Sequence, residues 1–281
     1  MQDITVIIRG AGDLATGVAH RLHRSGFKVL LLEVAKPLVV RRSVSFAQAV
    51  IDGAAEVEGV RAVKINTPAE VTHAWQQGAL PVLVDPAMDI LKKMKADVVI
   101  DATLAKRDTG MRRDMAPLTI GLGPGFEAGS QVHVVIETNR GHDMGRLIFT
   151  GTAEPDTGTP GLVKGFGVER VLRSPCSGAV RHVVDIGARV KKDEIICTVG
   201  EEPVRAQFDG IVRGLIMDGR EVPKGLKIGD VDPRAETDCY TISDKARALG
   251  GSVLEAILMW KNGLVHACRP STTNHNGKSP Q

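Results

Sequence analysis

Aromatic side chains and cysteines are scarce in this chain of 281 residues, and their scarcity excludes several kinds of protein. Aromatic residues make up 3% of the chain. The four cysteines, Cys176, Cys197, Cys239 and Cys268, are dispersed and form no C-x-x-C pair. This spacing argues against a zinc site and against a disulfide framework. We therefore expect no bound metal and a reducing, cytoplasmic location.

Long apolar runs and a strong excess of one charge are also missing. No apolar stretch approaches the roughly 20 residues that a membrane-spanning helix needs, and no leader-like segment precedes the first apolar run. Lysine and arginine number 36 and aspartate and glutamate 33, which gives a net charge of +3. The composition therefore predicts binding neither to a membrane nor to nucleic acid.

Glycine, in contrast, is abundant, with 31 residues, and the most informative glycines come early. A run rich in β-branched residues, 4–8, stops at Gly10 and Gly12. A helix-like segment follows, and then a second apolar run, 28–32, ends on Glu33. This order predicts a strand, a tight turn, a helix and a second strand, with an acid directly after it.

The spacing of Gly10, Gly12 and Ala15 matches the dinucleotide-binding pattern G-x-G-x-x-G/A. Gly10 permits the turn, Gly12 lets a phosphate approach the backbone, and the helix N-terminus offers N–H groups to an anion. Asp13 opposes a pyrophosphate there unless its side chain caps the helix. The alternative is an open α/β sheet whose turn holds another anion or no ligand. The residues expected at a nucleotide site in this stretch are Gly10, Gly12, Asp13, Ala15, Thr16 and Glu33.

Four further apolar runs, 80–84, 96–100, 118–120 and 132–136, are each followed by polar or glycine residues. Ligands bind at the carboxyl edge of open α/β sheets, so these followers are candidates for one crevice. Any one of these charges taken alone is equally compatible with a solvated loop. The candidates are Asp85, Asp101, Lys106, Arg107, Arg112, Arg113, Arg140 and His142.

Five other residues each allow both a functional and a structural interpretation. Arg41 and Arg42 follow the second strand and suit either a 2′-phosphate or a solvated surface. Gly123 and Gly125 either bring the backbone close to a ligand or turn a corner. His142 is a candidate proton carrier, and the alternative is a structural or surface histidine.

The composition changes beyond residue 150, where glycine and proline become frequent. From this change we expect a Rossmann-like nucleotide-binding domain (1–160), a linker (161–173), a β-repeat module (174–231), a C-terminal helical segment (232–267) and a flexible tail (268–281). The helix of the fourth region is expected to begin after Ser243 and to run to Trp260.

The β-repeat module repeats itself at a spacing of 32 residues. The repeated pairs are Gly178 and Gly210, Val180 and Val212, Arg181 and Arg213, Gly187 and Gly219, Val190 and Val222, Lys192 and Lys224, and Ile196 and Ile228. Equal spacing predicts duplicated β-units, and the repeat resembles a barrel-sandwich hybrid of the biotinyl/lipoyl type. The hairpin between the halves, 200–204, has no lysine, so covalent lipoylation or biotinylation is not expected. The predicted fold class is thus α/β, with a Rossmann-like N-terminal domain, this small all-β module and a C-terminal helix.

Six stretches together are more specific than any single motif. They are RGAGDLATG (9–17), PLVVRR (37–42), AKR (105–107), RDMAP (113–117), GLGPGF (121–126) and RGHDMGR (140–146). Through them the chain, over residues 1–265, resembles the YqeB-type maturation proteins of selenium-dependent molybdenum hydroxylase systems. These are distantly similar to the xanthine dehydrogenase accessory proteins with their Rossmann domain. The resemblance implies a bacterial cytoplasmic accessory factor and supplies no catalytic residues.

Two functions compete at this point. In the first, a maturation factor binds a phosphate-bearing ligand, either NAD(P) or a molybdopterin dinucleotide, and acts on the apoenzyme of a molybdenum hydroxylase. In the second, the protein is an NAD(P)-dependent oxidoreductase, for which His142, Lys106 and Arg107 are the available acid/base groups. A nucleotide-sensing scaffold without catalysis is a third reading. Whether the chain catalyses a reaction and whether it forms a homo-oligomer are left open.

Overall fold

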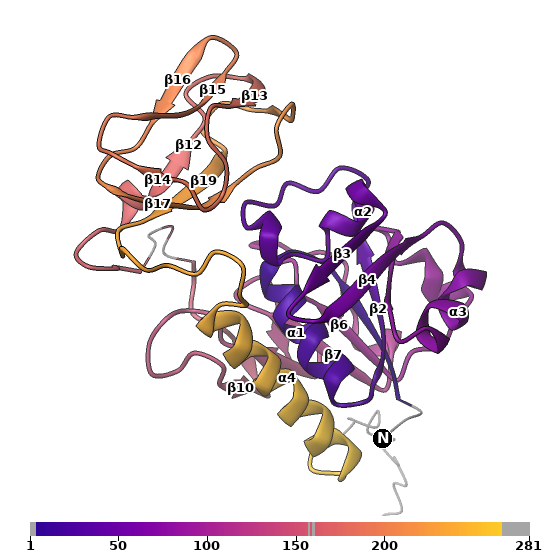
Figure 1. Ribbon diagram of the computed structural model, residues 1–281. Coiled ribbons are helices and arrows are strands. Elements are labelled where there is room, and N and C mark those ends of the chain that lie inside the picture. Colours follow the sequence, from indigo (N-terminus) through magenta and orange to yellow (C-terminus); the bar gives the residue numbers. More distant parts are fainter. Residues whose placement is uncertain (1–3, 157, 159–160, 266–281) are drawn as a thin grey trace, which may run out of the picture.

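The computed structural model describes residues 4–156, 158 and 161–265 (Figure 1). They form an α/β part around a large sheet and a β-unit that spans residues 171–232. The chain then returns to the α/β part, where helix α4 (Asp244–Lys261) packs along helix α1 (Asp13–Arg24). None of the helices in these ranges has the length and apolar character to span a membrane. The predicted tail, 268–281, lies outside the described residues.

The large sheet has nine strands in the order β10-β9-β7-β6-β1-β2-β5-β4-β3. Seven of them run parallel to their neighbours, whereas β3 and β10 pair antiparallel at the two edges. The bounds are β1 Thr5–Arg9, β2 Lys28–Glu33, β3 Ala54–Val57, β4 Val60–Ile65, β5 Leu80–Val84, β6 Val98–Asp101, β7 Leu118–Leu122, β9 Val134–Ile136 and β10 Leu147–Ile148.

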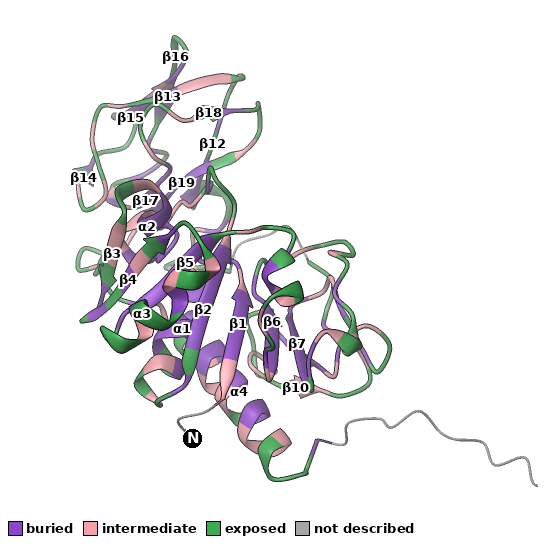
Figure 2. Cartoon of the chain, turned by 90° about the vertical axis from the view of Figure 1, so that its right-hand side faces the viewer, coloured by how far each residue is buried: buried purple, intermediate pink, exposed green. Residues whose placement is uncertain are grey.

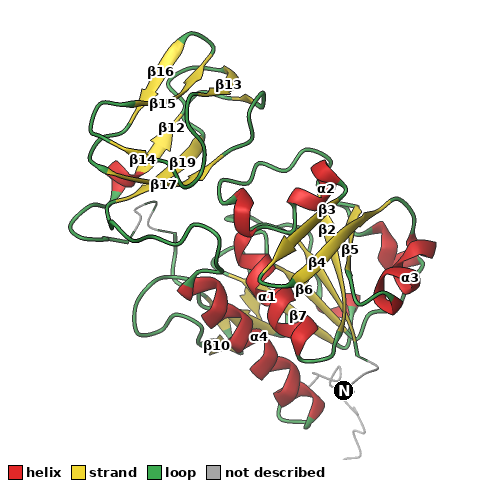
Figure 3. Ribbon diagram, viewed as in Figure 1, coloured by secondary structure: helices red, strands yellow, loops and turns green. Residues whose placement is uncertain are grey.

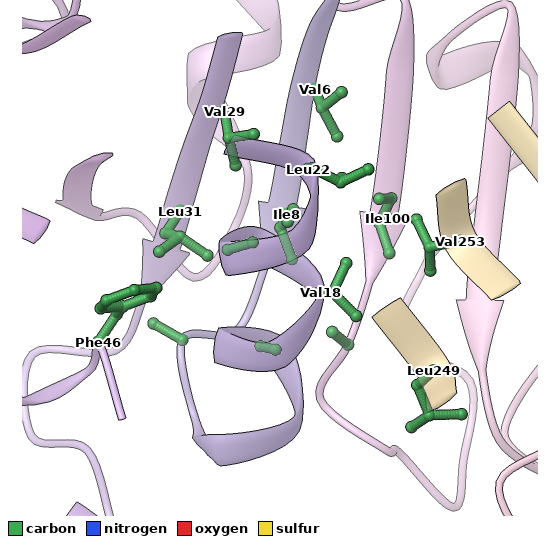
Figure 4. Close-up of a cluster of buried hydrophobic side chains, with 14 of the residues drawn as sticks. Val6, Ile8, Val18, Leu22, Val29, Leu31, Phe46, Ile100, Leu249 and Val253 are labelled. Carbon is green, nitrogen blue, oxygen red and sulfur yellow. The ribbon is translucent and has the colours of Figure 1, made fainter. Parts of the chain in front are cut away.

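Each face of this sheet has its own core. Helices α1, α2 (Gln48–Asp52) and α4 cover one face, where Ile8, Val18 and Leu249 meet (Figure 4). The other face is covered by one short α-helix, α3 (Val71–Gln76), with 3-10 turns and loops. The central strands are therefore mostly buried, and exposed residues gather in the connections (Figure 2).

The predicted fold class is wrong. The large sheet is mixed, because β3 and β10 reverse direction at its edges. The connection from β6 to β7 contains only a 3-10 turn, η4 (Arg113–Met115), and the connection from β7 to β9 only the short strand β8 (Glu127–Ala128), so neither has an α-helix. Glycine and proline recur in these connections, and both disfavour helix interiors. The protein is thus a mixed α/β protein with one large sheet and several smaller antiparallel sheets, in place of a Rossmann-like domain joined to a barrel-sandwich hybrid.

The β-unit consists of two four-stranded antiparallel sheets around a common core (Figure 3). Their orders are β12-β19-β17-β14 and β16-β15-β13-β18. The bounds are β12 Val171–Arg173, β13 Gly178–His182, β14 Arg189–Val190, β15 Ile195–Val199, β16 Glu202–Arg205, β17 Gly210–Leu215, β18 Glu221–Val222 and β19 Lys227–Asp232. A small two-stranded sheet elsewhere pairs β8 with β11 (Gly151–Thr152).

The 32-residue repeat appears directly in these strands, but the copies are not separate. Strands β13, β14 and β15 correspond to β17, β18 and β19. The short strand β14 pairs with β17 of the second copy, and β18 pairs with β13 of the first. Each sheet therefore contains strands from both copies.

Helices α1 and α4 approach each other at two glycines. A Cβ added to Gly17 would lie 2.6 Å from the Cβ of Ala246, and one added to Gly250 would lie 2.7 Å from the carbonyl oxygen of Gly17. Ser243 begins α4 as its N-cap and accepts a hydrogen bond from the Ala246 N–H, as the sequence predicts. The crossing fixes the first turn of α4 near the first turn of α1.

The two parts of the protein are joined through residues 40–43. Arg42 donates from Nε to the carbonyl oxygen of Leu215 and from Nη2 to Asp185 Oδ1, at 2.7 and 2.6 Å. Ser43 donates to the carbonyl oxygen of Cys239 at 2.6 Å. A Cβ on Gly214 would lie 2.8 Å from Val40 Cγ1, so the absence of a side chain there permits the close contact.

Candidate functional site

A cavity of about 240 Å³ lies beside the predicted glycine turn. Gly10 adopts a φ of +97°, the left-handed conformation that favours glycine. Gly12 is the N-cap of α1 with an extended backbone, and an added Cβ there would meet no atom within 4 Å. The turn therefore has the conformation that the sequence suggested, with open space at Gly12.

The acids beside this turn have partners in the backbone. Glu33 accepts hydrogen bonds from the N–H groups of Ala11 and Val34 at 2.8 and 2.7 Å. Asp13 accepts one from the Leu14 N–H at 3.0 Å. Both carboxylates line the small cavity. Glu33 thus stabilises the turn itself.

Two other predicted residues of this stretch are inside the core. Ala15 is buried between α1 and the sheet. Thr16 is fully buried, donates to the carbonyl oxygen of Ala11 and accepts from the Phe46 N–H at 2.9 Å. Thr16 therefore ties the turn to the segment before α2.

A larger cavity, of about 770 Å³, lies where the β-unit, the start of α4 and the loops after β6 and β9 meet. Leu104 lines both cavities, so the two adjoin. Leu104 has a φ of +52°, which is uncommon for a residue other than glycine. The basic residues that line the large cavity are Arg41, Lys106, Arg140, Arg170, Arg213, Lys227, Arg234 and Lys245.

Most of these cations are paired with carboxylates. Buried Arg170 contacts Asp230 at 3.3 Å, and Arg213 contacts the same carboxylate at 3.0 Å. Arg234 forms a bidentate pair with Asp232 at 2.9 and 2.7 Å. Burial alone would raise the pKa of Asp232, but the hydrogen bonds from Arg234 outweigh it and lower the pKa to about 2.

Arg140 and the neighbouring acid at the start of α4 form another pair. The guanidinium of Arg140 binds both carboxylate oxygens of Asp244, at 2.8 and 2.9 Å. These hydrogen bonds are the main reason that the pKa of Asp244 is well below its usual value. The next residue, Lys245, has a lowered pKa because of burial and then of the Arg140 charge. Within the described ranges its ammonium group forms no ion pair.

Arg41 differs from the paired arginines. It is 7% exposed, and its Nη2 donates to the carbonyl oxygen of Thr241 at 3.1 Å. Its Nε and Nη1 are buried and have no hydrogen-bond partner within the described residues. Its pKa is lowered, first by burial and then by the charge of Arg213, against the opposing effects of Asp13 and Asp230.

The remaining predicted site residues divide between the large cavity and the surface. Lys106 and Arg140 line the large cavity, and Lys106 pairs with Asp156. Arg107 and His142 are exposed and line neither cavity. Arg113 donates to the carbonyl oxygen of Gly129 away from both cavities.

Arg42 and the second glycine pair have structural contacts. Arg42 joins the two parts of the protein, as described above, and lines neither cavity. A Cβ at Gly123 would lie 2.9 Å from Thr138 Oγ1, and one at Gly125 would lie 2.2 Å from the Ala105 carbonyl oxygen. These two glycines therefore permit close packing of loops at the wall of the large cavity.

Sequence reasoning missed five cations of the large cavity: Arg170, Arg213, Lys227, Arg234 and Lys245. Arg170 lies in the predicted linker, and Arg213 was noted as a repeat of Arg181. The repeat did not mark Arg213 as a cavity residue, because its counterpart Arg181 pairs with Asp218 on the surface whereas Arg213 pairs with buried Asp230. No group of three or more His, Cys, Asp or Glu side chains suited to a metal ion occurs within the described ranges.

Comparison with solved structures gives only distant likenesses. One is an aspartoacylase family protein from Mesorhizobium loti, 12% identical, with a TM-score of 0.27 over 83% of this chain and 86% of that chain. Another is a succinylglutamate desuccinylase/aspartoacylase from Rhodobacter sphaeroides, 14% identical, with a TM-score of 0.26 over 83% and 86%. These TM-scores are too low to show a common fold, so the fold described above rests on the sheets themselves.

Comparison of sequences is more informative. No protein-family model matches the chain. The chain is 52% identical over 255 residues to the "Uncharacterized protein YqeB" of Escherichia coli (strain K12), which is 90% of this chain and 47% of the relative. The chain therefore spans about half the length of this curated relative. The predicted resemblance to YqeB is confirmed as a similarity of sequence to this uncharacterized protein.

Proposed function

We propose that the protein is an accessory factor for a selenium-dependent molybdenum hydroxylase and that it binds a phosphate-bearing ligand of the nucleotide or molybdopterin type. The observation that supports ligand binding is the pair of adjoining cavities, one beside an open glycine turn and one rich in arginine. The volume of the larger, about 770 Å³, is within the range of roughly 300–1,000 Å³ usual for small-molecule sites. The hydroxylase as partner is inferred from the resemblance of the sequence motifs.

The arrangement favours binding over hydride transfer. His142, a candidate proton carrier, is exposed and lines neither cavity. An NAD(P)-dependent oxidoreductase is therefore the less supported candidate.

The β-unit has a role in this proposal. It supplies Arg213, Lys227 and Asp230 to the large cavity, so the ligand would contact both parts of the protein. A factor that delivers a cofactor must hold the cofactor and its recipient together. We propose that the outer surface of the β-unit contacts the hydroxylase while its inner surface contacts the ligand.

The function can be tested in cells that contain such a hydroxylase. Deleting the gene should leave hydroxylase protein present but inactive, and the wild-type gene should restore its activity. Gly12→Val should not restore it, because the valine side chain would extend into the small cavity. Gly251→Ala is the matched control, because an added Cβ there meets no atom within 4 Å and lies on α4.

Two results would contradict the proposal. Full hydroxylase activity in the deletion strain would exclude the maturation role. Full rescue by a folded Gly12→Val protein would place the ligand elsewhere. Mass spectrometry of small molecules that copurify with the wild-type protein, but not with Gly12→Val, would identify the ligand.

A further inference from the structure

The two adjoining cavities have opposite charge. The small cavity is lined by Asp13 and Glu33, and no described lysine, arginine or histidine lines it. Ala11 at the turn already donates its N–H to Glu33. A phosphate at this turn would therefore face two carboxylates, which repel it at short range.

Hydroxyl groups suit the small cavity better than phosphate does. Carboxylates accept hydrogen bonds from hydroxyl groups, and an acid at the end of the second strand is the usual partner of a ribose hydroxyl. Gly12 leaves space next to Asp13 and Glu33 because an added Cβ would meet no atom there. The small cavity thus fits an uncharged end of a ligand that carries hydroxyl groups.

The large cavity is lined by Arg41, two of whose donor nitrogens have no hydrogen-bond partner among the described residues. Arg41 is 7% exposed, and its buried Nε and Nη1 have no hydrogen-bond partner among the described residues. Buried polar groups in folded proteins are almost always paired, and an unpaired charged donor is especially costly. The backbone of this segment is held against the β-unit, because the neighbouring Arg42 is bonded to Leu215 and Asp185.

The charges around Arg41 are unbalanced. Among the described residues, the cluster contains the guanidinium groups of Arg41, Arg170, Arg213 and half-exposed Arg234, and two carboxylates, Asp230 and Asp232. Two positive charges are left over. Asp13 acts on Arg41 from the turn without forming an ion pair with it. Lys245, which forms no ion pair among the described residues, lies near Asp13 as well. The lining of the large cavity as a whole has eight basic and six acidic residues, so it favours an anionic group.

We infer that the phosphate of the ligand is bound in the large cavity by Arg41, together with Arg213 and Lys245. The hydroxyl-bearing end of the same ligand lies in the small cavity against Asp13 and Glu33. This inference depends on the proposed function for the presence of a ligand, but it reverses the orientation that the glycine motif suggests. Phosphate oxygens would satisfy the free N–H groups of Arg41 with charge-assisted hydrogen bonds.

Calorimetric titration of the full chain with pyrophosphate, and separately with adenosine and cytidine, tests this orientation. Arg41→Met should weaken pyrophosphate binding by about 10- to 100-fold, because charge-assisted hydrogen bonds are lost. Gly12→Val should leave pyrophosphate binding unchanged and should weaken nucleoside binding. Arg107→Gln is the matched control and should change neither, since Arg107 is exposed and lines neither cavity.

The stability of the free protein gives a second readout. A merely structural arginine would lower the Tm when replaced, whereas Arg41→Met removes an unpaired buried charge and should not lower the Tm of the ligand-free protein. It should abolish the rise in Tm that pyrophosphate produces in the wild type. If Arg41→Met does not fold, two other measurements replace it. Lys245→Gln should weaken pyrophosphate binding, and the Nε–H NMR signal of Arg41 in the wild type should shift when pyrophosphate is added.

The outcomes separate the inference from the proposed function. Loss of pyrophosphate binding in Gly12→Val but not in Arg41→Met would place the phosphate at the turn and overturn the inference, while the proposed function would stand. An Arg41 signal that does not change with pyrophosphate would also overturn the inference. Pyrophosphate bound at Arg41 with no binding of any nucleotide or nucleoside would overturn the proposed ligand and keep the anion site.

Discussion

The small and large cavities adjoin at Leu104 but are built in different ways. The small cavity is formed mainly by residues 10–15 and 33–39, which follow the first two strands. The large cavity gathers side chains from residue 41 to residue 245, including both ends of the β-unit. A local pattern can therefore reveal the first cavity, whereas the second exists only once distant segments have packed together.

The largest effect should come from breaking the buried network of the large cavity. Asp230→Ala leaves Arg170 and Arg213, which are 7% and 17% exposed in their side chains, without their shared carboxylate. Loss of one partner from a buried ion pair typically costs about 3–5 kcal/mol, so the free energy of unfolding should fall by about that amount. Urea denaturation measures it.

The control for this variant is a surface acid. Asp114→Ala removes the partner of Arg112, and both side chains are mostly exposed, so stability should change little. An equal loss of stability in Asp230→Ala and Asp114→Ala would show that the network does not support the large cavity.

A smaller effect is expected in the pH dependence of the free energy of unfolding, because of the ionisation of Asp232. Its pKa is lowered to about 2 from a usual value of 3.8, so the charged form stabilises the folded state. This contribution, about 2 kcal/mol, is complete above the unfolded pKa and is lost as the pH falls from about 4 to about 2. The loss of stability over this range should be smaller in Asp232→Asn than in the wild type. Parallel curves for the two proteins would contradict the assignment.

The smallest change in stability is expected at the crossing of α1 and α4, the two helices whose first turns lie beside the cavities. Gly250→Ala places a Cβ 2.7 Å from the Gly17 carbonyl oxygen, so the helices must shift and stability should fall by about 1–2 kcal/mol. Gly251→Ala has no such neighbour and should raise stability by up to about 1 kcal/mol, because alanine favours helix. Thermal unfolding of the pair tests this, and stabilisation by both substitutions would exclude a close crossing.

The sequence supported accurate predictions where the deciding interactions are local. The order strand, turn, helix and strand around Gly10 and Gly12 is present, and so is the helix that begins after Ser243. The 32-residue repeat is visible in the strands of the β-unit because both copies keep the same spacing of glycine and apolar residues. In the first two cases the signal lies within a few residues of the structure that it predicts, and in the third it lies in the matching positions of the two copies.

The prediction of the fold class was wrong because the fold class depends on strand pairings that the local sequence does not indicate. Strand β10 has only two residues, Leu147–Ile148, and its antiparallel pairing with β9 makes one edge of the sheet mixed. The connections between β6 and β9 also contain no α-helix, whereas a Rossmann-like unit implies a helix after each strand. Edge strands of this length carry too little periodicity to be recognised.

The candidate site shows the same limit in two neighbouring residues. Arg41 and Arg42 are chemically identical and adjacent, yet Arg41 is buried at the large cavity and Arg42 is bonded to Leu215, 173 residues later. No property of the local sequence distinguishes them. The packing of the β-unit against residues 40–43 decides which arginine keeps donor atoms without a partner among the described residues.

The exchange of β14 and β18 between the two copies has a consequence for how the β-unit folds. A chain that ends after β16 contains the first copy but lacks β17, the strand with which β14 pairs. During synthesis β14 can therefore pair with its partner strand only after residues 210 and 211 have been made. An incomplete unit would leave open strand edges, which invite pairing between molecules. The β-unit should consequently fold as a single cooperative step, and neither 32-residue copy should be an independent folding domain.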